Sequence, residues 1–255
     1  MSVLRISRDS GVATIRIDRP PANAVDPAMI AEFLAVLPPL AADPEVRCLV
    51  ITGTGRFFVA GADIAVMRDL SAANQVEMRR WIDVQRLLEL APKPVIAAIN
   101  GHALGGGAEL SLACDLRIIS EAASFGFPEI ALGLFPGAGG SQRLPRLVGP
   151  HLAKRLMIEG ERLTSRHALD LGLVDLMVSA GEFDTVVAEW GRVLAAKPTR
   201  AIGLLKRVVD EGYGLPIEQA LTREEAGVRE LTQTGDAAEG LQAFLDKRTP
   251  KFTGT

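Results

Sequence analysis

Residues 95–110 read VIAAINGHALGGGAEL, and this stretch carries the signals that decide the fold. Its first five residues are a continuous apolar run, which is typical of a strand buried on both faces of a parallel sheet. A glycine-rich turn follows, and the next segment, 105–113, has the pattern of a helix. A buried strand, a turn and a helix in this order indicate an α/β protein.

The same alternation extends outward through the first half of the chain. Further strands are expected at 13–17, 48–52, 116–120 and 125–127. A helix is expected to begin at Pro27, because proline suits the first helical position, and to stop at about residue 37 before Pro38 and Pro39. A second helix is expected over 71–90, where the apolar residues have helical spacing.

The second half is mostly helical in pattern. Helices are expected at 150–158, 165–171, 182–196, 198–210, 216–231 and 236–247. The change from alternating elements to helices near residue 195 is the one plausible internal boundary, which predicts a core of residues 1–195 and a helical region of residues 196–255. No low-complexity linker lies there, so these helices are expected to pack on something rather than to swing free.

The composition excludes several classes of protein. The 255 residues are 48% hydrophobic and 23% charged, as in ordinary soluble domains. With 28 basic and 31 acidic side chains the net charge is −3, and only 5% of residues are aromatic, so no nucleic-acid partner is expected. No run approaches the roughly 20 apolar residues of a membrane helix. The N-terminus lacks the apolar core of a signal peptide, which favours a cytoplasmic protein.

Cysteine and histidine give no sign of a metal site. Cys48 and Cys114 lie inside apolar runs and form no CxxC pair, so buried thiols in a reducing compartment are expected. His102, His151 and His167 have no metal-ligand spacing with them.

The glycines at 105–107 open the helix that follows the buried strand. Backbone N–H groups at a helix start have no intrahelical partner, and without side chains over them they can bind an anion or a developing oxyanion. The run is neither a dinucleotide fingerprint nor a phosphate P-loop, because Leu110 stands where the third fingerprint glycine is needed and no Gly-Lys-Ser/Thr follows Gly106.

Two glutamates accompany this turn. Glu109 lies three residues after Gly106, on the same face of the expected helix, where it can transfer protons beside a polarised carbonyl or simply complement the helix dipole. Glu129 lies 20 residues further on, beside Pro128, and is either a partner of Glu109 across a site or a surface glutamate. Paired carboxylates suit the addition of water to a double bond, one activating the water and the other donating a proton.

A second glycine turn follows another expected strand. Residues 57–64 read FFVAGADI, and the Ala-Gly-Ala centre allows a backbone N–H to face a ligand, although an ordinary tight turn has the same composition. One N–H here together with that of Gly106 would make a two-donor oxyanion hole. The sequence alone leaves open whether the two turns meet.

Three motifs now stand in order: GADI at 61–64, NGHALGGGAEL at 100–110 and PEIALGLFPGAGGSQRLPR at 128–146. Together they closely resemble the crotonase superfamily, and specifically the enoyl-CoA hydratases. The resemblance continues through 162–175 and 239–252, so it covers essentially the whole chain. It implies a spiral of ββα units with a C-terminal helical region used in trimerisation, as a homotrimer or a dimer of trimers.

Matched position by position, the resemblance assigns the oxyanion hole to the N–H groups of Ala62 and Gly106, with Asp63 and Ile64 also at the substrate. The two hydratase glutamates correspond to Glu109 and Glu129. The implied reaction is syn addition of water to a 2-trans-enoyl-CoA, as in fatty-acid β-oxidation, giving a 3-hydroxyacyl-CoA without a metal or redox cofactor. Glu129 is expected to act as the base, with the α-carbon proton delivered through Glu109.

The chain departs from the family pattern at its CoA-binding positions. No lysine stands at Pro21 or Ala65, so Lys247, which matches a C-terminal family lysine, is expected to contact CoA from a neighbouring subunit unless it is an ordinary solvated helix-end lysine. Phe135 replaces a smaller residue and is expected to alter the acyl pocket. The alternative activities are a Δ3,Δ2-enoyl-CoA isomerase, another acyl-CoA thioester reaction, or a non-catalytic RNA-associated homologue.

Overall fold

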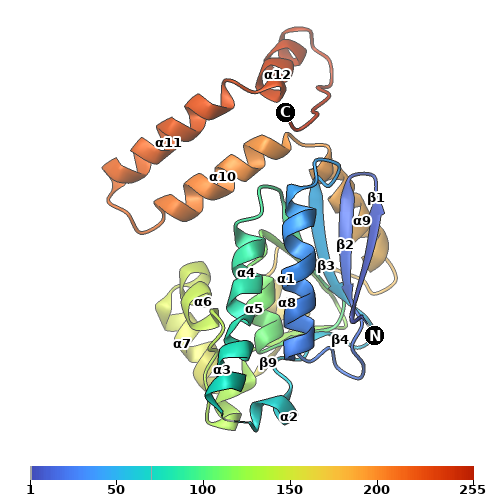
Figure 1. Ribbon diagram of the computed structural model, residues 1–255, viewed down its shortest axis with the longest axis vertical. Helices are drawn as coiled ribbons and strands as arrows, with labels where there is room; N and C mark the ends of the chain where they lie inside the picture. The colour runs from blue at the N-terminus through green and yellow to red at the C-terminus, as the bar shows by residue number, and fades with distance from the viewer. Residues whose placement is uncertain (1, 70) are drawn as a thin grey trace.

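The strands form two sheets in the computed structural model, which describes residues 2–69 and 71–255 (Figure 1). The larger sheet has the order β1 (Leu4–Asp9), β2 (Val12–Ile17), β3 (Cys48–Gly53), β5 (Val95–Ile99), β7 (Leu116–Ser120) and β10 (Leu176–Val178). The smaller sheet has the order β4 (Phe57–Val59), β6 (His102–Leu104), β8 (Ser124–Gly126) and β9 (Arg162–Thr164). From β2 to β10 the larger sheet is parallel, while β1 runs antiparallel.

Successive units of the chain give one strand to each sheet and then a helical segment. β3 and β4 are followed by α2 (Ile64–Met67), α3 (Ala72–Arg79) and α4 (Trp81–Glu89), and β5 and β6 are followed by α5 (Gly106–Leu112). β7 and β8 are followed by the 3₁₀-helix η1 (Pro128–Leu132), α6 (Gly140–Val148) and α7 (Pro150–Glu159). This is the expected spiral of ββα units, and it brings the turns after β4, β6 and β8 to one end of the stack.

The larger sheet is buried on both faces, as its continuous apolar runs predict. In β3, Leu49 and Ile51 belong to the main core, together with Phe33 of α1 (Pro27–Ala42). The alternate residue Val50 belongs to a second cluster, which α9 (Phe183–Ala195) covers. Successive side chains of a strand point to opposite faces, so a strand without polar positions needs a cover on each side.

The helix that begins at Pro27 does not stop at the Pro38-Pro39 pair, as the sequence predicts, but continues to Ala42. The two prolines cannot donate backbone hydrogen bonds, yet Leu40, only 3% exposed, anchors the last turn in the core. Lys93 Nζ then donates to the carbonyl oxygens of Leu40, Asp43 and Val46 at 3.1, 2.9 and 2.6 Å. Core packing and this cap outweigh the hydrogen bonds that the prolines remove.

Other differences concern short or irregular elements. The helix expected over 71–90 is two helices, α3 and α4, which meet at Arg80. The sequence analysis does not predict α6, which follows the glycine-rich run 137–140 and contains Pro145. The fully buried Leu144 anchors this helix in the core. The remaining predicted helices agree within a few residues with α7, α8 (Ser165–Asp170), α9, α10 (Thr199–Gly212), α11 (Ile217–Leu231) and α12 (Gly235–Leu245).

The C-terminal helices extend away from the sheets in Figure 1, and polar contacts tie their base to the core. Arg47, just before β3, donates to the carbonyl oxygens of Lys197 and Phe252 at 2.8 and 2.6 Å. Lys206 of α10 forms an ion pair with Asp115 at 2.8 Å. The start of α10 lies where the helical region was expected to begin, and the division of the chain into a core of residues 1–195 and a helical region of residues 196–255 stays a prediction.

Both cysteines are buried and free, as expected. Burial raises the pKa of Cys48 and of Cys114 to about 12, so neither thiol is reactive near neutral pH. Among the described helices, none is both long and apolar enough to span a bilayer.

Candidate active site

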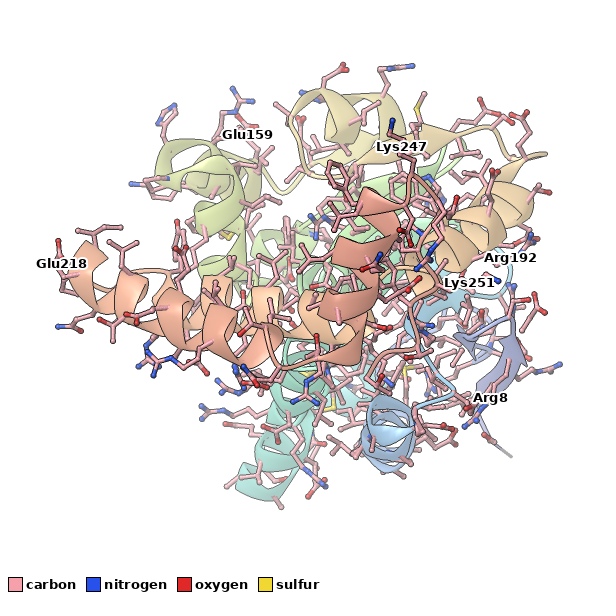
Figure 2. The ribbon with its side chains drawn as sticks, turned by 90° about the horizontal axis from the view of Figure 1, so that it is seen from above. Arg8, Glu159, Arg192, Glu218, Lys247 and Lys251 are labelled. Carbon is pink, nitrogen blue, oxygen red and sulfur yellow. The ribbon has the colours of Figure 1, made fainter. Side chains whose placement is uncertain are left out.

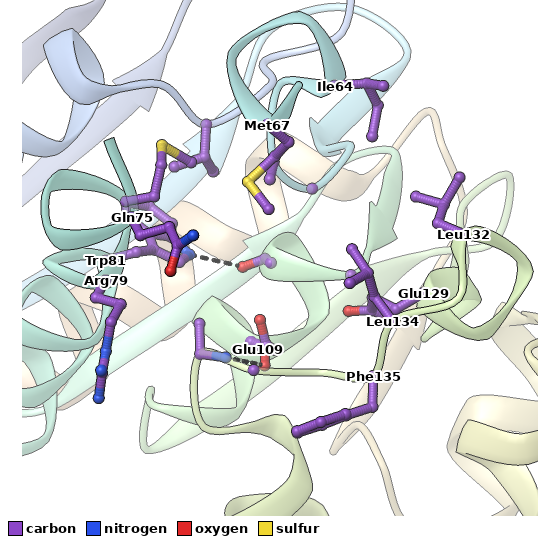
Figure 3. A pocket seen from close by; sticks show the side chains of 18 of the residues that line it. Ile64, Met67, Gln75, Arg79, Trp81, Glu109, Glu129, Leu132, Leu134 and Phe135 are labelled. Carbon is purple, nitrogen blue, oxygen red and sulfur yellow. Dashed lines mark hydrogen bonds between the residues drawn. The ribbon is translucent and has the colours of Figure 1, made fainter. Parts of the chain in front are cut away.

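A cavity of about 540 Å³ opens where the turns after β4, β6 and β8 meet (Figure 3). Its volume lies within the range of ordinary small-molecule sites. Most of its surface is apolar, and the polar side chains at its centre are those of Glu109 and Glu129. The convergence that the sequence left open is therefore present: the two carboxylates from separate segments line one cavity.

Glu109 lies in the first turn of α5 and is only 3% exposed. Its Oε1 accepts hydrogen bonds from the backbone N–H groups of Ala138 and Gly140, at 2.8 and 2.9 Å. Burial raises the pKa of Glu109, while these two donors and the positive charge of Arg143 act in the opposite direction. The carboxylate thus has a preorganised set of donors for its charged form.

Glu129 lies in η1 and is held much less tightly. Its Oε2 atom is buried, and no hydrogen-bond partner for it is found among the described residues. Burial raises the pKa of Glu129 to about 7, and the negative charge of Glu109 adds to this rise. A carboxyl group of this kind keeps its proton close to neutral pH.

The two glycine turns meet beside these carboxylates. A Cβ built on Gly61 would lie only 3.6 Å from the Gly106 nitrogen, and one on Gly106 would lie 3.7 Å from Gly61 Cα. Ala62 and Gly106 both line the cavity, and no hydrogen bond from either N–H is found within the described part of the chain. Two unpaired donors at adjacent turns fit the expected oxyanion hole.

The three successive glycines serve three different needs. Gly105 has a φ of +52°, which residues with a Cβ rarely adopt. Gly106 faces the cavity. Gly107 packs against β4 so closely that a Cβ would lie 2.1 Å from the Val59 carbonyl oxygen. The sequence interpretation, in which all three clear the way for a ligand, therefore fits Gly105 and Gly106, which line the cavity, but not Gly107, which packs against β4.

The other predicted binding residues are placed differently. Ile64 lines the cavity, but Asp63 does not. The Asp63 carboxylate forms an ion pair with Arg19 at 2.7 Å and accepts the N–H of Ala65 at 3.0 Å, so its contacts hold the turn and do not support a substrate contact by this side chain. Lys247 lies just after α12, exposed and outside the residues that line this chain's cavity (Figure 2).

Several lining residues were not predicted from the sequence. Trp81 of α4 is buried and packs edge-on against Phe33, and its Nε1 donates to the Gly106 carbonyl oxygen at 3.1 Å. Phe135, by contrast, was singled out in the sequence, and it lines the cavity. Apolar side chains from α2, α3, α4 and the segment around the end of η1 complete the wall: Met67, Met78, Ile82, Leu132 and Leu134. Only helical periodicity marks Met78 and Ile82, and periodicity does not distinguish a core face from a pocket face.

The described residues show neither a candidate metal site nor a histidine in the cavity lining. No group of three or more His, Cys, Asp or Glu side chains that could hold a metal ion is found among them. His102 lies on β6, outside the cavity lining, where its Nδ1 is 3.0 Å from the Ser124 hydroxyl and its ring packs on Phe57.

Comparison with known proteins agrees with the geometry. A family model described as enoyl-CoA hydratase/isomerase matches residues 7–255. A crotonyl-CoA hydratase of Syntrophomonas wolfei is 40% identical over 97% of this chain and 96% of its own length. A probable enoyl-CoA hydratase of Bacillus subtilis is 38% identical over the full length of both chains. The crystal structure of an enoyl-CoA hydratase from Bacillus anthracis, 35% identical, superposes over both whole chains with a TM-score of 0.95. The resemblance seen in the three motifs is confirmed: this chain belongs to the enoyl-CoA hydratase/isomerase family.

Proposed function

We propose that this protein is an enoyl-CoA hydratase that adds water to a 2-enoyl-CoA thioester to give a 3-hydroxyacyl-CoA. The observation that carries the proposal is the pair of carboxylates, Glu109 and Glu129, which line one cavity beside two backbone N–H groups that have no partner among the described residues. The hydratase names of full-length relatives at 38–40% identity support the same activity. The addition of water causes no net oxidation or reduction, so the reaction needs no redox cofactor.

The hydrogen bonds support a division of roles between the carboxylates that is the reverse of the one inferred from the sequence. A general base must be ionised and a general acid protonated at the working pH. Burial raises the pKa of Glu109, but two backbone donors and a nearby arginine oppose this rise by stabilising its carboxylate. For Oε2 of Glu129 no hydrogen-bond partner is found among the described residues, and burial raises the pKa of Glu129 to about 7. We therefore assign the base to Glu109 and the acid to Glu129.

The steps follow from this assignment. The thioester oxygen accepts hydrogen bonds from the N–H groups of Ala62 and Gly106, which draws electrons from the conjugated double bond and stabilises the enolate-like transition state. A water between the glutamates loses a proton to Glu109 as its oxygen bonds to the β-carbon. Glu129 gives its proton to the α-carbon. Both additions occur from the side of the double bond that faces the glutamates, and one proton then returns from Glu109 to Glu129.

The absorbance of the conjugated enoyl thioester tests the proposal. With crotonyl-CoA the wild-type protein should consume the conjugated substrate and form 3-hydroxybutyryl-CoA. With a 3-enoyl-CoA an isomerase would instead create the conjugated chromophore. Rapid gain of signal from the 3-enoyl substrate, with no loss from crotonyl-CoA, would replace hydration by isomerisation as the activity.

The C-terminal helices support the further proposal of a homotrimer or a dimer of trimers. They expose large apolar side chains that a monomer would leave in water, among them Leu241 at 71%, Phe244 at 82% and Leu245 at 73% exposure. Exposed apolar surface of this kind marks contact sites with other chains. The buried free thiols suit a reducing compartment and support a cytoplasmic location. A role in fatty-acid β-oxidation is proposed only from the enoyl-CoA substrate class.

The Lys247→Ala variant tests whether this lysine reaches the CoA of a neighbouring subunit. Its ammonium group would contact a phosphate without touching the reacting atoms, so we expect KM for crotonyl-CoA to rise by up to about fivefold, as for one exposed ion pair, with kcat unchanged. Lys251, an exposed lysine on the same C-terminal tail, provides the matched control (Figure 2). Equal effects of Lys247→Ala and Lys251→Ala on KM would remove the specific role of Lys247.

A further inference from the structure

The two N–H groups that hold Glu109 belong to a turn that needs support of its own. The turn comprises residues 137–140, which lead from the segment after η1 into the first residue of α6, and within it Gly139 has a φ of +108°. Ala138 and Gly140, on either side, both donate to Oε1 of Glu109. A shift of this turn would move or release the glutamate, so whatever fixes the turn also fixes the carboxylate.

Arg143, in the first turns of α6, lies directly against this segment. Its Nη1 is 3.4 Å from the Ala138 carbonyl oxygen, and a Cβ built on Gly139 would lie 1.9 Å from the same nitrogen. The guanidinium therefore occupies the space that a side chain at position 139 would need. Arg143 itself is only 15% exposed.

The other side of the guanidinium is anchored on α4. Nε and Nη2 of Arg143 donate to the two carboxylate oxygens of Glu89, at 2.5 and 2.8 Å, and Nη1 donates to Oε1 of Gln85 at 2.8 Å. A two-pronged arginine–carboxylate contact fixes both distance and orientation, which a lysine cannot do. α4 also carries Trp81, whose indole holds the Gly106 carbonyl group.

From this continuous set of contacts we propose that Arg143 is a positioning residue for the hydration reaction: clamped by Glu89, it fixes the 137–140 turn and thereby holds the carboxylate of Glu109 in place. The proposal rests on the proposed function insofar as Glu109 is the base. Burial raises the pKa of Glu109, and the positive charge of Arg143 opposes that rise. Three charged groups surround Glu109. Arg143 of α6 and Glu129 of η1 interact with its charge directly, and Glu89 of α4 pairs with the far side of Arg143.

A merely structural ion pair between α4 and α6 would have a different signature. Its loss would lower the melting temperature but leave the folded fraction with normal kcat and a normal pH profile. Loss of a positioning residue lowers kcat at nearly unchanged KM, because the substrate still binds while the base is misplaced. It also moves the acidic limb of the kcat–pH profile to higher pH, because Glu109 loses donors and a nearby positive charge.

The test compares Arg143→Gln, Arg143→Lys and Glu89→Gln. We expect Arg143→Gln to lower kcat for crotonyl-CoA on the order of 10²-fold and to shift the acidic limb upward. Arg143→Lys keeps the charge without the two-pronged contact, so it should lower kcat with a smaller shift of the limb. Arg16→Gln is the matched control, since Arg16 donates to the Gly53 carbonyl oxygen at 3.1 Å, outside the cavity lining, and its loss should leave kcat and the limb unchanged.

Amide hydrogen exchange gives a readout that does not depend on the reaction. The N–H groups of Ala138 and Gly140 should exchange faster in Arg143→Gln than in wild type, whereas both should be unchanged in Arg16→Gln. This result stands even if the wild type proves not to hydrate crotonyl-CoA, so the two proposals fail separately. Normal kcat and pH profile in folded Arg143→Gln, or unchanged exchange of both amides, would overturn the positioning role; if that variant does not fold, Glu89→Gln decides by the same measurements.

Discussion

The Glu109→Gln and Glu129→Gln proteins are each expected to lose about 10²- to 10⁴-fold in kcat for the hydration of crotonyl-CoA, the usual contribution of one positioned acid or base. Glutamine has nearly the shape of glutamate, and its amide oxygen can still accept the N–H groups of Ala138 and Gly140. The losses would therefore report the missing proton transfer and not a collapsed site.

The double variant adds information on how the two groups cooperate. If both transfer protons in one concerted addition, the combined loss should be much smaller than the product of the two single losses. A near-normal rate in either single variant would remove that glutamate from the mechanism. The measurement is the steady-state decrease in absorbance of the conjugated thioester, at substrate concentrations that determine kcat and KM separately.

The pH dependence checks which glutamate is the acid. With Glu129 as the acid, kcat/KM of the wild type should fall as pH rises above about 7, where the free enzyme loses the Glu129 proton. With the roles exchanged, activity would instead require ionised Glu129 and would rise through the same range. The direction of the change near neutral pH thus distinguishes the assignment made from the contacts from the one made from the sequence.

Thermal unfolding of Glu129→Gln provides the folding control. The pKa of Glu129 determines at which pH this variant should be more stable than the wild type. The pKa of Glu129 is about 7 in the folded protein and 4.5 in the ordinary case, so the folded state binds more protons between these values. The stability contributed by this group therefore falls as pH rises from about 4.5 to about 7. Above that window Glu129→Gln should melt at a higher temperature than wild type, and near pH 4 the difference should be small. A lower melting temperature at pH 8 would contradict the buried, uncompensated carboxylate.

The sequence predicts those parts of the fold that are governed by local patterns. Continuous apolar runs such as 48–52 and 95–99 locate strands that are buried on both faces, and the structure confirms them almost to the residue. The Pro38-Pro39 pair leads to a wrong prediction of the helix end. The free energy that the prolines cost is offset by the burial of Leu40 in the core and by the hydrogen bonds of Lys93 at the helix end. Neither contact can be read from the residues next to the prolines in the sequence. Three-residue strands such as β4 and β6 are too short to show a period.

In the candidate site, too, the sequence predicts local features but not those that depend on contacts between distant segments. Glu109, Glu129 and the two glycine turns can be identified because their motifs combine unusual composition with fixed spacing. The unequal support of the two glutamates cannot, because it comes from Ala138, Gly140 and Arg143, which reach Glu109 only after α6 folds back against α4 and α5. Asp63 is a third case: its motif suggests a substrate contact, which stays a prediction, while its side chain forms an ion pair with Arg19, 44 residues earlier in the chain.

The Gly106→Pro protein is expected to lose about 10²- to 10³-fold in kcat, the usual effect of removing one oxyanion-hole donor. Gly106 is the first residue of α5, where proline is accepted because the N–H has no intrahelical partner. Gly105 before it has no Cβ to clash with the proline ring. The substitution therefore removes the proposed donor while leaving the helix its hydrogen bonds.

Gly106→Ala is the matched control, because it adds a side chain but keeps the N–H. A Cβ on Gly106 would have its nearest contact with Trp81 Nε1 at 3.4 Å, an ordinary van der Waals distance. We expect this variant to keep most of its kcat, and both proteins to melt close to wild type. If Gly106→Ala loses as much activity as Gly106→Pro, bulk at this position and not the missing donor explains the loss. If Gly106→Pro keeps a normal kcat, the thioester oxygen is not held at this helix start, and the polarisation on which both glutamates depend must come from elsewhere in the cavity.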